Sequence, residues 1–384
     1  MTIAMDAEPP RLPNTIRAIN DGIAQNLHLG AQLYVSSAGD PIADCGIGEA
    51  RSGMPMRPDH LMLWMSSVKP ITVIAIAQMW EQELLALDDP IAKHIPEFAA
   101  SGKSAVTVRH VLTHTGGFPT AALQWVSAAS SWEQIIAEIS AAPLEAGWIP
   151  GQTAGYHVAS GWYILAEIVR RLDGRPYSRY VCEAIFEPLG MRDSWLGMPP
   201  EKYREYGDRV VAMHSYVSDS ERPRAFKPDW DAPYRFWSGS EEACAICRPG
   251  GSGWGPIREL GHFYEALLAG GKGLVSPQTV AAITARHTVG LHDKTFGYLL
   301  DRGLGVVIDS KKYGVGASWF GTRCSPRSFG HAGAWSSVAF ADPEYRLVVA
   351  LVFNGMMAAN PPKHDARVVR VLDALYDDLG LGAR

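Results

Sequence analysis

The segment Ser66-Ser67-Val68-Lys69-Pro70 leads into an apolar run from Ile71 to Trp80, and the rest of the chain is interpreted around this stretch. Pro70 is tolerated in the first turn of a helix, where its missing backbone N–H costs least, and the apolar residues after it predict a buried helix. Side chains three positions apart share a helix face, so the amine of Lys69 can reach the hydroxyl of Ser66. The segment therefore predicts a serine held at a helix N-terminus beside its own base.

A Ser-x-x-Lys spacing alone is weak evidence, because it arises by chance and usually marks a helix cap and a solvated lysine. Three further motifs follow it along the chain. They are Leu112-Thr113-His114-Thr115-Gly116-Gly117, then Tyr156-His157-Val158 after Pro150-Gly151, and then Gly330-His331-Ala332-Gly333-Ala334-Trp335, which opens a strand-like run through Phe340. The ordered combination is more specific than any single motif.

This ordered set resembles the serine β-lactamase and penicillin-binding-protein superfamily, most closely its branch of class C β-lactamases, family VIII esterases and transesterases. The resemblance extends roughly from Gly30 to Asn354. It implies that Ser66 is the nucleophile, Lys69 its activating amine and Tyr156 the tyrosine of the second motif.

The resemblance also assigns the third motif, where relatives carry Lys-Thr-Gly or His-x-Gly and this chain has His331-Ala332-Gly333. It implies that His331 is one of the catalytic residues and that Gly333 contacts the substrate. It further implies that the backbone N–H groups of Ser66 and Ala334 form the oxyanion hole.

The chemistry of the residues agrees with these assignments. A serine hydroxyl is a poor nucleophile until a base within hydrogen-bond reach takes its proton. Lysine and tyrosine are both protonated in water at neutral pH. We therefore expect Lys69 and Tyr156 to be coupled in a partly desolvated cleft that depresses the pKa of at least one of them. The alternative is that Tyr156 is a buried packing residue before a helix.

Two departures from the family pattern bear on the substrate. Relatives usually have Tyr-x-Asn, whose amide can hold a carbonyl group, and here the third position is Val158. A site without that polar partner discriminates poorly for polar acyl groups, which favours esters over β-lactams or peptides. Trp335 stands where relatives are rich in glycine, and we expect it to form a pocket wall.

The segment from Tyr203 to Pro249 is rich in aromatic residues and proline, and it includes Trp230 and Trp237. In one interpretation this segment forms a wall of the acyl pocket, with Trp230 and Trp237 among the substrate-binding residues. In the other it is a packed, irregular crossing between the lobes.

Strands at both ends of the chain and helices between them predict an α/β fold of the α+β type. It has an antiparallel sheet flanked by helices and completed by both termini. The expected helices cover residues 14–26, 132–140, 162–172, 257–268, 277–286 and 365–379, and the expected strands cover 30–37, 41–48, 303–308, 328–342 and 347–354. Residues 1–65 and 245–384 are expected to form the sheet lobe and 66–244 an inserted, mainly helical lobe. The active site would lie where the lobes meet.

The composition of the chain bears on its binding partners and its location. The chain has 384 residues, 47% hydrophobic residues and a net charge of -5, with no basic footprint for nucleic acid. The first ten residues lack the features of a signal peptide and no apolar run reaches the length of a membrane span, so a cytoplasmic protein is expected.

The same inspection gives no metal or cofactor motif. Five cysteines, among them the single Cys244-x-x-Cys247 pair, suggest reduced thiols rather than disulfides or zinc. His110 and His114 have helical spacing but lack the glutamate of a zinc-protease motif, which favours a structural role. No Gly-x-Ser-x-Gly sequence is present, which argues against an α/β-hydrolase elbow.

These observations predict a serine carboxylesterase that works through an acyl-enzyme on Ser66 and takes a small-molecule ester or acyl donor. The alternative is an acyltransferase of the same family. A β-lactamase or D-amino-acid peptidase fits less well because of Val158. A catalytically silent binding module fits least, since it has no physical reason to keep Ser66, Lys69 and Tyr156 together.

Overall fold

The computed structural model describes residues 12–121, 130–215, 239–334, 336–356 and 366–382. A nine-stranded antiparallel sheet has the order β3-β2-β1-β13-β12-β11-β10-β9-β8. Its strands are β1 Gly30–Ser37, β2 Asp40–Arg51, β3 Met54–Pro55, β8 Thr288–Asp293, β9 Tyr298–Arg302, β10 Val307–Ile308, β11 Phe329–Gly333, β12 Ser337–Asp342 and β13 Leu347–Phe353. The N-terminal hairpin β1–β2 joins the C-terminal strand β13, so both ends of the chain complete the sheet, as predicted.

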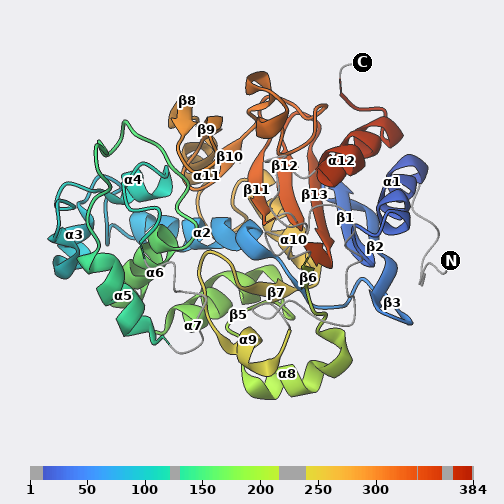
Figure 1. Cartoon of the computed structure of the whole chain (residues 1–384), viewed down its shortest axis with the longest axis horizontal. Helices are drawn as coiled ribbons and strands as arrows, with labels where there is room; N and C mark the ends of the chain where they lie inside the picture. The colour runs from blue at the N-terminus through green and yellow to red at the C-terminus, as the bar shows by residue number, and fades with distance from the viewer. Residues whose placement is uncertain (1–11, 122–129, 216–238, 335, 357–365, 383–384) are drawn as a thin grey trace, which may run out of the picture.

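Strand β13, in the interior of the sheet, is buried along its whole length because helices cover both faces of the sheet. Successive side chains point to opposite faces, so Val348 and Ala350 enter one core while Leu347 and Val349 enter the other. The first core packs against α10 Ile257–Leu268 and α2 Lys69–Glu81. The second packs against α1 Pro13–Ala24 and α12 Ala366–Asp378, which lie side by side in Figure 1.

The remaining helices gather mainly on the side of the molecule away from α1 and α12 (Figure 1). They are α3 Ile91–His94, α4 Val108–Leu112, α5 Trp132–Ala141, α6 Ser160–Asp173, α7 Tyr177–Val181, α8 Pro200–Tyr206, α9 Glu241–Ala245 and α11 Pro277–Thr284. Two small sheets join distant segments: β4 Met62–Leu63, β7 Gly253–Gly255 and β5 Trp195–Leu196 in one, and β6 His214–Ser215 with β14 Gly355–Met356 in the other. The small sheet β4-β7-β5 leads straight into the segment that carries Ser66.

The predicted fold class is confirmed, and two strand predictions are wrong. The expected strand 328–342 is two strands, β11 and β12, joined by a turn in which the N–H of Ser336 donates to the carbonyl of Gly333 at 2.8 Å. Both strands consist largely of apolar residues, and no Asn-Gly or Asp-Gly pair marks the turn between them. The sequence pattern of 328–342 therefore looks like that of a single strand. The expected strand 303–308 is only β10, because Gly305 takes a φ of +65° and donates to the carbonyl of Leu112.

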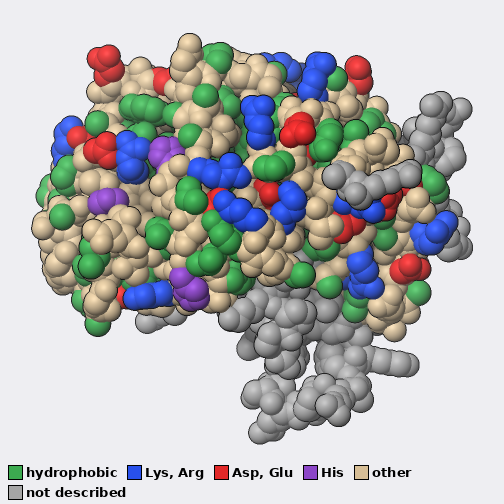
Figure 2. All heavy atoms as spheres, turned by 90° about the horizontal axis from the view of Figure 1, so that it is seen from above, with side chains coloured by type: hydrophobic (Ala, Val, Ile, Leu, Met, Phe, Trp, Pro, Cys, Tyr) green, Lys and Arg blue, Asp and Glu red, His purple; other side chains and the backbone are tan. Residues whose placement is uncertain are grey.

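Strands β8 and β9 were missed because polar residues such as Asp293 and Arg302 stand at their ends and interrupt the apolar signal. The division into a sheet lobe and an inserted helical lobe stays a prediction. Among the helices of the described ranges, none is long and apolar enough to cross a membrane. On the face seen in Figure 2, basic and acidic side chains of the described residues lie interspersed.

Candidate active site

Ser66 stands in a short 3₁₀ turn, Met65–Val68, that leads directly into α2. It is partly exposed, whereas every other residue from 61 to 70 is buried. Met65 takes a φ of +50°, a conformation that costs a non-glycine residue roughly 1–3 kcal/mol and recurs at active sites. The hydroxyl of Ser66 is thus accessible one turn before the buried helix α2, whereas the sequence predicts Ser66 at the N-terminus of that helix.

Gly333 allows strand β11 to run against the backbone of this turn. A Cβ atom at position 333 would lie 2.4 Å from the carbonyl oxygen of Trp64 and 2.8 Å from the Cβ of Met65. No side chain fits there, so the glycine of the third motif is required for the close approach. Its predicted contact with substrate stays a prediction.

Ser67, next to the candidate nucleophile, has a structural position. Its hydroxyl is buried, lies 2.9 Å from the hydroxyl of Ser337 and donates to the carbonyl of His331 at 3.2 Å. Ser337 in turn donates to the carbonyl of Trp64 at 2.6 Å. These bonds tie the serine turn to β11 and β12.

Lys69 is fully buried beneath Ser66. Its Nζ lies 2.8 Å from Oγ of Ser66 and donates to the carbonyl oxygens of Val158 and Gly250 at 2.9 and 2.6 Å. Burial holds the pKa of Lys69 well below its usual value. A neutral amine has two N–H groups and one lone pair. When the amine is neutral and both N–H groups bind these carbonyls, its lone pair is left to face Ser66, which is the arrangement a general base requires.

Tyr156 lies close to both Lys69 and Ser66. The Nζ of Lys69 is 5.1 Å from the centre of the tyrosine ring. Burial raises the pKa of Tyr156, and a hydrogen bond with Ser66 lowers it in part. The phenol therefore keeps its proton at neutral pH, and the group with the depressed pKa is Lys69.

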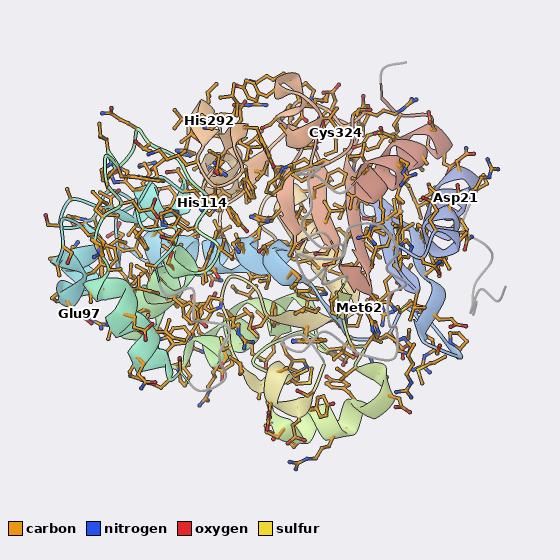
Figure 3. The ribbon with its side chains drawn as sticks, in the orientation of Figure 1. Asp21, Met62, Glu97, His114, His292 and Cys324 are labelled. Atoms are coloured by element: carbon orange, nitrogen blue, oxygen red, sulfur yellow. The ribbon has the colours of Figure 1, made fainter. Side chains whose placement is uncertain are left out.

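His114 supports Tyr156 from behind, a contact that the sequence analysis missed. Its ring centre lies 4.8 Å from that of Tyr156, and its Nδ1 accepts the backbone N–H of His157 at 2.9 Å. His114, labelled in Figure 3, is buried and has a φ of +59°. Its burial lowers its pKa well below the usual value, so the imidazole is neutral. The signal available in the sequence was the Thr-His-Thr-Gly-Gly turn.

His331 is brought to the same site by strand β11. Its ring centre lies 5.9 Å from that of Tyr156, and its Nδ1 lies 2.7 Å from the carbonyl oxygen of Ala332. Burial and the nearby Lys69 keep its pKa well below the usual value. His331 is therefore neutral.

An aromatic wall, formed by Phe296, Tyr298 and Trp319, continues from these rings and was also missed. Phe296 packs against Tyr156 at 4.7 Å and against Trp319 at 5.5 Å, and Trp319 packs against His331 at 5.5 Å. The indole N–H of Trp319 donates to the hydroxyl of Tyr298 at 3.1 Å. Phe296 and Tyr298 are partly exposed. These residues come from β8–β9 and a distant loop, so no local motif marks them.

Of the other predicted site residues, the structure describes two and leaves three outside the described ranges. Val158 is partly exposed, and its carbonyl binds Lys69. Ala334 is exposed in the turn after β11, and its oxyanion role stays a prediction. Trp335, Trp230 and Trp237 lie outside the described residues.

Metal-binding groups were sought within the described ranges, and no set of three His, Cys, Asp or Glu side chains there lies close enough to hold an ion. The five cysteines are all free thiols. His110 caps the N-terminus of α4, since its Nδ1 accepts the N–H of Thr107 at 3.2 Å. This contact is the structural role predicted for it.

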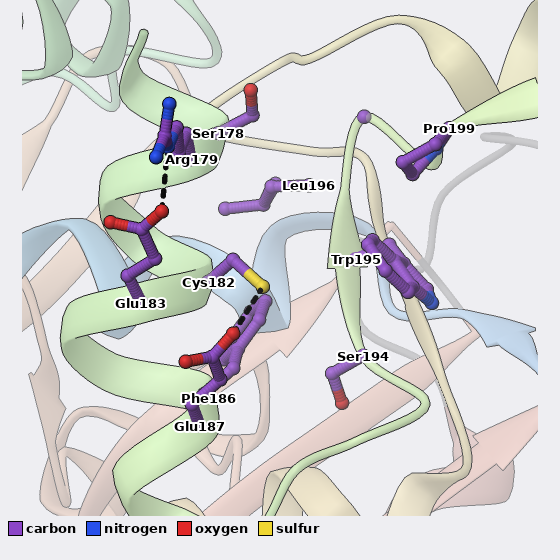
Figure 4. Close-up of a pocket in the computed structure, with 11 residues that line it drawn as sticks. Ser178, Arg179, Cys182, Glu183, Phe186, Glu187, Ser194, Trp195, Leu196 and Pro199 are labelled. Carbon is purple, nitrogen blue, oxygen red and sulfur yellow. Dashed lines mark hydrogen bonds and ion pairs between the residues drawn. The ribbon is translucent and has the colours of Figure 1, made fainter. Parts of the chain in front are cut away.

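A surface pocket of about 230 Å³ lies between the segment around Cys182 and strand β5 (Figure 4). Its lining includes Arg179, Glu183, Trp195 and Leu196. None of the predicted site residues contributes to it, so it is separate from the serine.

The chain is similar to known proteins in sequence and in fold. A sequence model of the Beta-lactamase family matches residues 15–374. Esterase/beta-lactamase LipL of Mycobacterium tuberculosis is 24% identical over 369 residues, covering 92% of this chain and 83% of LipL. Esterase EstB of Burkholderia gladioli is 27% identical over 287 residues, covering 66% of this chain and 70% of EstB.

Among solved structures, a penicillin-binding-protein homologue from Caulobacter crescentus superposes with a TM-score of 0.78 at 28% identity, covering 98% of this chain and all of that one. The match to the family model spans nearly the whole chain, and the matched range includes Ser66, Tyr156 and His331. This protein therefore belongs to the beta-lactamase family.

Proposed function

We propose that this protein is a serine hydrolase that cleaves carboxylic esters through a covalent acyl-enzyme on Ser66. The observation that carries the proposal is the position of the Lys69 amine, 2.8 Å from the serine oxygen with its other bonds made to two backbone carbonyls. The relatives LipL and EstB are both named esterases, which supports the ester as substrate.

In the first half of the reaction, Oγ of Ser66 attacks the ester carbonyl and its proton moves to Nζ of Lys69. The backbone N–H groups of Ser66 and Ala334 stabilise the oxyanion. The phenol of Tyr156 then gives its proton to the departing alkoxide, and the proton on Lys69 restores the phenol. The products of this half are a free alcohol and an ester of Ser66.

In the second half, water attacks the acyl-enzyme. The same groups take a proton from the water and return one to Oγ of Ser66, which releases the carboxylic acid. Every proton taken from a nucleophile is thus returned to a leaving group within one turnover.

The surroundings of Tyr156 suggest which esters are used. The proton donor stands beside the leaving alcohol, and the aromatic wall of Phe296, Tyr298 and Trp319 begins at its ring. Such a wall suits uncharged, apolar alcohol groups. Val158 has no amide to hold a polar acyl side chain, which disfavours β-lactams and D-amino-acid peptides.

The second candidate is an acyltransferase that delivers the acyl group to an alcohol. The aromatic wall favours it, because an apolar alcohol that binds beside Tyr156 competes with water for the acyl-enzyme. The two activities share Ser66, Lys69 and Tyr156. They differ only in the acceptor.

Incubating the protein with a series of p-nitrophenyl esters and a chromogenic cephalosporin, while following product release and intact mass, tests the proposal. We expect ester turnover and a mass increase equal to one acyl group. Adding an aliphatic or benzyl alcohol separates transfer from hydrolysis, because only transfer yields a new ester. If neither turnover nor a covalent adduct is found, the proposal is wrong and the protein is best interpreted as a catalytically silent binding module.

A cytoplasmic location is part of the proposal. It is supported by the five free thiols, since the cytosol keeps cysteines reduced. Cell fractionation with an antibody to the protein tests it.

A further inference from the structure

Asp293 and Arg302 form an ion pair that is enclosed in the protein behind Tyr156. Nη2 of Arg302 lies 2.6 Å from Oδ2 of Asp293, and the two side chains are 1% and 0% exposed. Removing two charges from water costs several kcal/mol per ion, so a buried pair is weak evidence of a contribution to stability. Its position calls for another explanation.

The second oxygen of Asp293 fixes a tight turn. Oδ1 accepts the backbone N–H groups of Thr295 and Phe296 at 2.9 and 2.8 Å, and the carbonyl of Asp293 accepts the N–H of Gly297 at 2.7 Å. One carboxylate therefore connects Arg302 on β9 with the turn 293–297.

This turn holds the segment that carries Tyr156. The hydroxyl of Thr295 donates to the carbonyl of Tyr156 at 3.2 Å, and the N–H of Lys294 donates to the carbonyl of Ala154 at 3.0 Å. The ring of Phe296 packs on the tyrosine ring at 4.7 Å. Backbone and ring of Tyr156 are both held by residues whose own position depends on Asp293.

Asp293 engages only one of the three guanidinium nitrogens of Arg302, namely Nη2. The other two, Nε and Nη1, are buried and have no hydrogen-bond partner in the part of the chain that the structure describes. Burial raises the pKa of Tyr156 most, the charge of Arg302 lowers it in part, and the charge of Asp293 raises it by a smaller effect. The sign for Arg302 is the expected one, because a positive charge favours ionisation of a nearby phenol.

The titratable and charged groups around the phenol come from several elements. They are Lys69 on α2, His114 after α4, Asp293 on β8, Tyr298 and Arg302 on β9, and His331 on β11. Since burial keeps Lys69, His114 and His331 from holding protons readily, Arg302 is the permanent cation of this group.

We infer that Asp293 and Arg302 are positioning residues for Tyr156: together they fix the 293–297 turn against the tyrosine and keep a permanent positive charge beside its hydroxyl-bearing ring. The inference rests on the proposed function, because it takes Tyr156 to be the group that protonates the leaving alcohol.

The test compares two esters with the same acyl group, a p-nitrophenyl ester and an ethyl ester. A good leaving group departs without help, whereas an alkoxide needs the proton of Tyr156. We expect Arg302→Met to lower kcat for the ethyl ester by about a hundredfold and for the p-nitrophenyl ester by about tenfold or less. KM should change little for both. Arg302→Lys should recover part of the loss.

Two further variants keep the test decisive. Asp293→Asn combined with Arg302→Met removes both charges and so leaves no unpaired buried ion. An unequal loss in the same direction is expected, smaller than that of Arg302→Met alone, because the charges of Asp293 and Arg302 act on Tyr156 with opposite signs. Arg286→Met is the matched control, because Arg286 pairs with Asp301 at 2.9 Å on the same strand β9 but has no contact with Tyr156. It should leave the ratio of the two kcat values unchanged.

Equal losses for both esters, or the same unequal loss in Arg286→Met, would overturn the inference. Failure of the proposed function has a different signature, namely a wild-type protein that turns over neither ester. In that case the ultraviolet titration of Tyr156, measured as wild type minus Tyr156→Phe, still tests the pair. The tyrosine should ionise at higher pH in Arg302→Met, and an unchanged titration would contradict the inference.

Discussion

The hydroxyl of Ser67 lies 2.9 Å from the hydroxyl of Ser337, and this contact directs it into the sheet while the adjacent Ser66 meets the amine of Lys69. Two neighbouring serines therefore have separate tasks. One belongs to the packing of the turn against β12, and the other is open to substrate.

A fluorophosphonate should label Ser66 and leave Ser67 unmodified. Ser66→Ala should lower ester turnover by several orders of magnitude, because a nucleophile works as a unit with its base. Ser67→Ala, as the control, should keep turnover within a few-fold and lower the free energy of unfolding by about 1 kcal/mol. Peptide mapping after labelling checks the assignment, and an adduct on Ser67 or Ser252 would disprove it.

Lys69→Met should abolish the base while preserving the length of the side chain, with a loss of turnover of about a hundredfold or more. A base must be unprotonated, and burial lowers the pKa of Lys69. Wild-type turnover should thus persist at neutral pH and fall as the pH drops through that lowered value. The pH dependence of kcat measures this.

The chain offers a matched control for that variant. Lys103 is also buried and donates to three backbone carbonyls, those of Ala100, Ser140 and Ala142, but no serine hydroxyl meets its amine. Lys103→Met should lower stability and leave the pH profile of turnover unchanged. Equal effects of the two substitutions on kcat would argue against a base at position 69.

Tyr156→Phe removes one hydroxyl and opens no cavity, so it isolates proton transfer. We expect turnover to fall by about a hundredfold, with a larger loss for alkyl esters than for p-nitrophenyl esters. Steady-state kinetics with both ester types measures the effect. Near-wild-type turnover at neutral and alkaline pH would make Tyr156 a packing residue and move the search for a proton donor to His331.

Val158→Asn should raise turnover of amide-bearing β-lactams relative to simple esters. An unpaired buried polar group costs about 1–3 kcal/mol, which corresponds to roughly tenfold to a hundredfold in relative rate. Competition between a cephalosporin and a short ester measures the ratio. A wild-type enzyme that already prefers the cephalosporin would contradict the interpretation of Val158.

Trp335→Gly should widen the range of acyl chain lengths that the enzyme accepts. If Trp335 forms the pocket wall predicted from the sequence, its removal should relieve a size limit. A series of p-nitrophenyl esters of increasing chain length measures this. An unchanged cut-off would show that position 335 does not line the acyl pocket.

Much of the site was predictable from sequence because its central contacts are local or belong to short motifs. Ser66 and Lys69 are one helical turn apart, and the geometry of a helix start brings them together without reference to the rest of the fold. The hairpin β1–β2 and helix α10 were predictable for a similar reason, since each carries its own period of apolar residues.

The remainder depends on contacts between distant segments. Phe296 and Trp319 reach Tyr156 and His331 only because β8, β9 and a loop fold back over the site. The pairing of Asp293 with Arg302 depends on the register of β8 and β9, two strands whose ends are charged and whose pattern is irregular. The pattern of apolar residues within one segment cannot predict these contacts between segments.

The pairing of β1 with β13 has a consequence for how the protein is made. The backbone N–H of Gly30 bonds to the side chain of Asn354, a span of 324 positions in the chain. During synthesis the first hairpin therefore leaves the ribosome long before its partner strand exists, and its unpaired edge stays open until β13 has emerged. Folding of the sheet is for this reason a late event, and we expect nascent chains that stop short of residue 347 to depend on chaperones that shield β1.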